Sequence, residues 1–94
     1  MIIQGNDLQK VVGGYCKSYR DSIGATLNEV GGDELVKNVS GFEHGRSSHL
    51  KYLVYYTWLA DRNGDGEQFQ EGLTSTIRQY IREGTGLDVE KLTK

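Results

Sequence analysis

The sequence contains no proline and only one cysteine, and each of these facts limits the folds and cellular settings to be expected. Cys16 has no partner for an internal disulfide, whereas small secreted domains usually carry several, so we expect a reducing, cytoplasmic setting. Without proline, the 13 glycines are the main helix stops. This balance favours helices separated by glycine turns over a loop-rich β-sandwich.

Long hydrophobic runs and a basic excess are also missing. No stretch reaches the roughly 18 apolar residues that a membrane span needs, and the N-terminal residues lack the charged and apolar parts of a signal peptide. The formal net charge is −2, and the 11 lysines and arginines are scattered along the chain, whereas nucleic-acid binding needs a basic field. We therefore expect a soluble protein whose direct partner is neither a membrane nor a nucleic acid.

The chain has 94 residues, enough for a single domain (residues 1–94) with a modest core. Apolar residues recur every three or four positions over residues 7–30, which predicts one long first helix that stops at Gly31-Gly32. The pair Gly13-Gly14 interrupts this helix. It predicts either a bend or a close contact with another backbone.

Three further helices are expected, at residues 33–41, at Leu50–Ala60 and from just after Gly66 to the glycines Gly84 and Gly86. Leu50–Ala60 is apolar or aromatic on every side, so this helix should be central. Its tyrosine, valine and tryptophan content also fits a buried strand, but no second strand-like run exists to pair with it. The predicted fold is all-α, a compact bundle of about four helices.

The segment from Asp61 to Gly66 resembles the first half of an EF-hand calcium loop, because oxygen-bearing side chains alternate before a glycine. Asp61, Asn63 and Asp65 would supply three ligands. The closing glutamate belongs at loop position twelve, whereas Glu71 falls at position eleven. The alternative is an ordinary tight connection in which Asp65 caps the next helix. Calcium is the one cofactor that the sequence suggests.

No other pattern indicates catalysis. His44 and His49 are five residues apart, which suits neither one helical face nor the common zinc spacings. Cys16 belongs to the apolar stripe of the first helix, where a buried, inert thiol is expected. The chain has no nucleophile triad, phosphate-binding glycine loop or zinc-protease helix motif. We therefore predict that the protein is not an enzyme.

The aromatic content is high, with six tyrosines and one tryptophan. A small bundle cannot turn every ring inward, and tyrosine and tryptophan are enriched at protein interfaces. We expect Tyr52, Tyr55 and Tyr56 to reach the surface along one edge of the central helix and to bind another protein together with Glu43 and Arg46. For any single tyrosine, the alternative is a hydroxyl at the rim of the core. A homodimer that buries these rings is a further alternative.

Three short stretches resemble the small four-helix immunity proteins that neutralise nuclease bacteriocins: residues 34–37, Tyr55-Tyr56 and residues 72–80. Those proteins are more acidic, and their tyrosine pair lies on a very short helix, so no residue role is carried over. The resemblance implies a class of bacterial and phage proteins that inhibit or regulate a partner by covering its surface. We predict such a protein-binding function, with a calcium-binding helical module at Asp61–Glu71 as the alternative.

Overall fold

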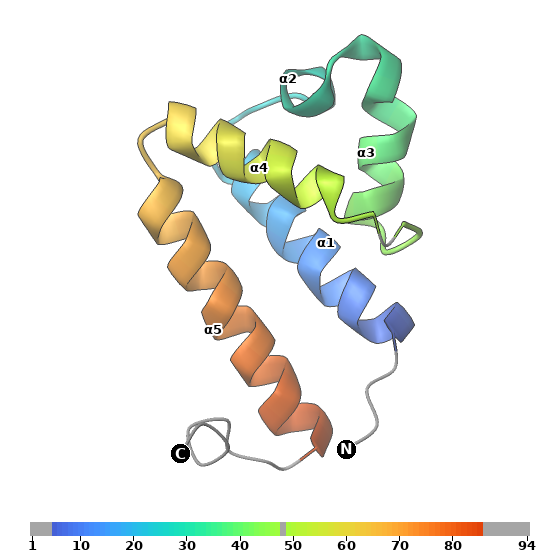
Figure 1. Ribbon diagram of the computed structural model, residues 1–94, viewed down its shortest axis with the longest axis vertical. Coiled ribbons are helices and arrows are strands. Elements are labelled where there is room, and N and C mark those ends of the chain that lie inside the picture. The colour runs from blue at the N-terminus through green and yellow to red at the C-terminus, as the bar shows by residue number, and fades with distance from the viewer. Residues whose placement is uncertain (1–4, 48, 86–94) are drawn as a thin grey trace.

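The computed structural model describes residues 5–47 and 49–85, and every regular element within them is helical (Figure 1). The predicted all-α class is therefore confirmed. No helix in these residues is long and apolar enough to cross a membrane. The elements are α1 (Gly5–Ser22), α2 (Leu27–Gly31), the 3₁₀ turn η1 (Asp33–Leu35), α3 (Val36–Glu43), α4 (Lys51–Arg62) and α5 (Gly66–Thr85).

Two long helices, α1 and α5, pack side by side and run in opposite directions (Figure 1). The other face of α1 contacts α3, while α4 contacts both α5 and α2. The molecule measures 42 × 27 × 19 Å. A helix with its side chains is about 10 Å across, so the shortest dimension holds only two layers. Each helix in such a thin arrangement keeps one side toward solvent.

The core is built mainly from aromatic side chains. Tyr52 and Tyr56 of α4 and Phe69 of α5 are each at most 2% exposed. The ring centroid of Phe42 lies 5.7 Å from that of Tyr52 and 6.1 Å from that of Tyr56, and the ring of Tyr19 meets Phe69 edge-on at 5.1 Å. Each aromatic side chain removes about 150–250 Å² from water, so a chain of this size can build a core from a few rings.

The single helix predicted over residues 7–30 is wrong, because the structure divides it into α1 and α2. The chain turns at Gly24, whose φ of +69° lies in the left-handed region that favours glycine. Arg20 Nη1 donates a hydrogen bond of 2.9 Å to the carbonyl oxygen of buried Ala25, which stabilises the turn. Val30 then returns to the same core from α2. The apolar spacing continued across the turn because both segments face one core.

The other helices are confirmed with small changes in their bounds. The segment predicted at residues 33–41 starts as η1 and continues as α3 beyond Gly41. It extends to Glu43 because the side chains of Phe42 and Glu43 both lie in the core. The segment Leu50–Ala60 forms α4 and not a strand, and α5 begins at Gly66 itself, slightly earlier than predicted.

Gly13 lies where α1 meets α3. A Cβ atom at this position would overlap the backbone carbonyl oxygen of Phe42 and would lie 2.9 Å from that of Glu43. Helix α1 is continuous through Gly13 and Gly14. Of the two predicted alternatives, the structure therefore shows the close backbone contact. Gly14 has no atom within 4 Å of its Cβ position and makes no comparable contact.

This difference predicts opposite effects for two neighbouring substitutions. Gly13→Ala should lower the free energy of unfolding by about 1–3 kcal/mol or more, because two helix backbones must separate to admit the methyl group. Gly14→Ala should raise it by about 0.5–1 kcal/mol, because alanine is the better helix former where space is open. Urea denaturation followed by circular dichroism measures both values. Equal effects at the two positions would contradict the close packing of α1 on α3.

Candidate functional site

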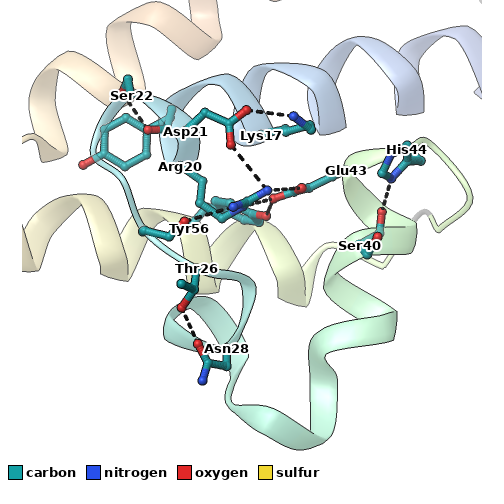
Figure 2. Close-up of polar contacts among 12 residues, drawn as sticks. Lys17, Arg20, Asp21, Ser22, Thr26, Asn28, Ser40, Glu43, His44 and Tyr56 are labelled. Carbon is teal, nitrogen blue, oxygen red and sulfur yellow. Dashed lines mark hydrogen bonds and ion pairs between the residues drawn. The ribbon is translucent and has the colours of Figure 1, made fainter.

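A buried ion pair joins α1, α3 and α4 (Figure 2). Arg20 Nε lies 2.7 Å from Glu43 Oε2, and Arg20 Nη2 lies 3.0 Å from Glu43 Oε1, so the guanidinium binds both carboxylate oxygens. The hydroxyl of Tyr56 donates a further hydrogen bond to Glu43 Oε2. The Glu43 side chain is only 1% exposed. A carboxylate is tolerated at such burial only when it is paired and hydrogen-bonded in this way.

This environment also sets the protonation of two neighbouring groups. Burial raises the pKa of the Cys16 thiol to about 12, and the charge of Glu43 adds to the effect. Burial raises the pKa of the Tyr56 hydroxyl as well, and the hydrogen bond to Glu43 acts in the same direction. Both groups therefore keep their protons near neutral pH. The inert thiol predicted for Cys16 agrees with this geometry.

The predicted tyrosine edge is largely wrong. Tyr52 is 1% exposed, Tyr56 is fully buried, and Glu43 is 4% exposed, so these three residues belong to the core. Tyr55 is half-buried, and Arg46 is exposed. The physical reason is that Tyr56 satisfies the buried carboxylate of Glu43 while Tyr52 packs on Phe42, which directs this side of α4 inward.

The exposed apolar side of α4 lies opposite the side that carries Tyr52 and Tyr56. Leu50 is 77% exposed, Val54 is 65% exposed and Trp58 is 54% exposed. These three residues, here called the outer face of α4, follow one another every four positions and so lie along one side of the helix. Sequence reasoning missed this orientation, because a segment that is apolar on every side does not indicate which side meets the core.

An open groove of about 710 Å³ runs beside the outer face, between α2 and α4. Its α4 wall carries Val54, Tyr55, Trp58 and Arg62, and Gly31 lies in the α2 wall. The guanidinium carbon of Arg62 lies 4.6 Å from the ring centroid of Trp58, a cation–π contact that orients both side chains. Of the residues predicted to bind a partner, Tyr55 is the one that lines this groove.

The loop predicted to bind calcium connects α4 to α5, and its polar side chains lie at the start of α5. Asp65 Oδ2 accepts hydrogen bonds from the Tyr19 hydroxyl at 2.9 Å and from Asn63 Nδ2 at 2.7 Å. The backbone carbonyl oxygen of Asp65 accepts the first helical hydrogen bond of α5, which Phe69 N donates at 2.8 Å. The Asp61 carboxylate packs on Gly66 at the start of that helix. This geometry matches the alternative of a tight helix-to-helix connection, with Asp65 directly before α5 and its carboxylate bonded to Tyr19 and Asn63.

The structure does not gather the four proposed calcium ligands, Asp61, Asn63, Asp65 and Glu71, into one ligand set. Glu71 is exposed on α5. Within the described part of the chain, no group of three or more His, Cys, Asp or Glu side chains is placed to hold a metal ion. A calcium site needs six to eight oxygen ligands, so this loop would have to rearrange to form one.

Comparisons of the chain with protein-family models, with curated proteins and with solved structures found no significant match. The resemblance to immunity proteins therefore stays a sequence-based expectation.

The buried ion pair predicts a large loss of stability when Glu43 is neutralised. Glu43→Gln should lower the free energy of unfolding by about 3–5 kcal/mol, because the Arg20 guanidinium then keeps only the longer contact of 3.6 Å with the half-exposed carboxylate of Asp21. Lys17→Gln is the control, since it removes a charge from the exposed Lys17–Asp21 pair one turn earlier on α1 and should have a much smaller effect. Urea denaturation compares the variants. Similar losses for both would contradict a structural role for the pair.

The raised pKa of Cys16 predicts falling stability in mild alkali. The thiol of the unfolded chain titrates near 9, whereas the folded pKa is about 12, so above about pH 9 the unfolded state releases a proton that the folded state keeps. The free energy of unfolding should therefore decline as pH rises, and Cys16→Ala should decline less between about pH 8 and pH 10. Parallel pH profiles for the two proteins would show that Cys16 does not cause the decline in the free energy of unfolding.

Proposed function

We propose that this chain is a small, non-enzymatic protein that inhibits or regulates another protein by binding it, and that the outer face of α4 is its binding surface. The observation that supports this proposal is the exposure of Leu50, Val54 and Trp58 in one line on a helix whose other side is core. Soluble proteins rarely leave large apolar side chains contiguous and exposed unless the surface meets a partner.

The composition of the surface supports the same proposal. Tryptophan and arginine are the residues that most often dominate binding energy at protein interfaces, and here Trp58 and Arg62 stack on each other at the groove. The buried side of α4 fixes the helix through Tyr52 and Tyr56, so the outer face is held in one conformation before binding. A preorganised surface loses less conformational entropy on association.

The surface proposed here replaces most of the tyrosine edge expected from the sequence. Tyr55 stays part of the proposed binding surface because it lines the groove. Arg46 is exposed in the segment before α4. The absence of enzymatic activity is supported by the burial of Cys16 and Tyr56, whose raised pKa values suit structural groups better than nucleophiles or acids at neutral pH. The cytoplasmic setting and the bacterial or phage origin remain sequence-based predictions.

The proposal predicts that one truncation on the outer face weakens partner binding. Affinity capture with the full chain from its native host should return a dominant protein, which is then purified and titrated against the variants by calorimetry. Trp58→Ala should weaken binding by about 2 kcal/mol or more, which is about thirtyfold, because a central aromatic anchor is lost.

Gln70→Ala, at an exposed position on α5, is the matched control and should bind like the wild type. Circular dichroism should confirm that both variants are folded. Wild-type affinity in Trp58→Ala would place the binding surface elsewhere and reject this proposal.

A further inference from the structure

We propose that a second copy of this chain covers the outer face of α4 when the partner is absent, an inference that rests on the function proposed above. The two copies pair α4 against α4 in opposite directions, about a two-fold axis. Self-association then regulates the proposed binding surface, because only the single chain can bind the partner. Opposite charges at the two ends of α4 support this pairing.

Charges of both signs border the outer face, so the face does not favour a partner segment of one sign. Lys51 at the start of α4 and Asp61 near its end are both exposed. At about 100° per residue, both fall with Leu50, Val54 and Trp58 within about 100° of the helix circumference. Asp61 also lines the same hollow of about 440 Å³ as these apolar side chains. A surface with this charge pattern is complementary to a reversed copy of itself.

The two charges cannot neutralise each other within one chain. Ten residues separate Lys51 from Asp61, and a rise of 1.5 Å per residue places them about 15 Å apart along the helix axis. An ion pair needs its nitrogen and oxygen atoms within about 4 Å. In the part of the chain that the structure describes, neither side chain makes an ion pair or a hydrogen bond, and Lys51 Nζ lies 5.4 Å from the ring centroid of Tyr52. Both charges are therefore available to a group from outside the chain.

An antiparallel pair of helices brings the two charges together. When the two-fold axis lies level with Tyr56, each residue faces the residue of the other copy that is equally far from Tyr56 in the opposite direction. Lys51 is five residues before Tyr56, and Asp61 is five residues after it. Lys51 of each copy therefore faces Asp61 of the other copy. One arrangement forms two equal ion pairs.

The same arrangement packs the exposed apolar side chains. Val54 is two residues before Tyr56 and Trp58 is two residues after it, so Val54 of each copy meets Trp58 of the other at the centre. Leu50 faces Arg62, whose aliphatic stem is apolar. Packed helices lie about 8–10 Å apart, a distance that lysine and aspartate side chains can bridge. The apolar contacts and the ion pairs are thus compatible.

Other occupants of the outer face leave charges unpaired. A parallel pair of copies would place Lys51 beside Lys51 and Asp61 beside Asp61. An antiparallel pair centred at Val54 would place Lys51 opposite Thr57. A foreign segment with charges of one sign, or an anionic lipid surface, would satisfy Lys51 but repel Asp61. Charge complementarity therefore selects the antiparallel pair centred at Tyr56.

The association should be weak enough to be displaced. Helix α4 has 12 residues, which span about 18 Å, whereas a standard stable interface buries about 800 Å² on each partner. One face of so short a helix gives an interface at the small end of the range, so we expect a dissociation constant in the micromolar range or above. The fraction of single chains would then set the apparent affinity for the partner.

The first test is sedimentation velocity of the full chain between about 1 μM and about 1 mM, where the mass should rise from one chain to two. Lys51→Glu and Asp61→Lys should each weaken dimerisation about tenfold or more, because like charges then face each other at two places. Trp58→Ala should weaken it as well, because the central apolar contact is lost. Lys37→Glu reverses an exposed charge on α3 and should leave dimerisation unchanged.

The sharper test combines the two charge reversals. An equal mixture of Lys51→Glu and Asp61→Lys places opposite charges at both contact positions, so it should form dimers at a concentration where each variant alone is a single chain. The double variant Lys51→Glu/Asp61→Lys should dimerise like the wild type. Circular dichroism checks that every variant is folded. A wild type that stays a single chain up to about 1 mM, or a mixture that stays single, would overturn the inference.

The captured partner distinguishes this inference from the proposed function. Added to the wild-type dimer, the purified partner should yield a complex that contains one copy of the chain. A partner that binds the intact dimer would overturn the inference. A partner that depends on Trp58, together with a chain that never dimerises, would reject the inference alone. Dimers that respond to charge reversal as expected, together with full partner affinity in Trp58→Ala, would reject the proposed function alone.

Discussion

The carboxylate of Glu43, almost entirely buried, is held by Arg20 from α1 and by Tyr56 from α4 while its own backbone belongs to α3. An ionised group in that position must keep its partners, so three helices are constrained by one side chain. The same point brings the backbones of α1 and α3 into contact at Gly13. Polar pairing and close backbone packing thus specify a single arrangement at the centre of a small core.

The orientation of α4 follows from this constraint. Tyr56 is bonded to Glu43 and Tyr52 packs on Phe42, and Leu59 and Ala60 are buried on the same side, so Leu50, Val54 and Trp58 point away from the core. In a molecule only 19 Å thick, no additional layer of described residues covers them. The exposure of Leu50, Val54 and Trp58 therefore follows from the orientation that the buried contacts of α4 impose on the helix.

Charges of both signs border the outer face of α4. Lys51, Asp61 and Arg62 are exposed on α4, and Glu29 lies across the groove on α2. The net charge of the whole chain argued against nucleic acid, but it carried no information about this local arrangement.

The sequence by itself determined the helical class, three of the four predicted helices to within a few residues and the inert character of Cys16. These properties depend on spacing and residue type along the chain. Only the tertiary structure decided the break at Gly24, the extension of α3 to Glu43, the role of Asp65 at the start of α5 and the side of α4 that meets the core. The physical reason is that the last three depend on partners distant in the sequence: Arg20 for Glu43, Tyr19 for Asp65, and Glu43 for Tyr56. The turn at Gly24 depends on a hydrogen bond from the Arg20 side chain to the carbonyl oxygen of Ala25, which the spacing of apolar residues does not reveal.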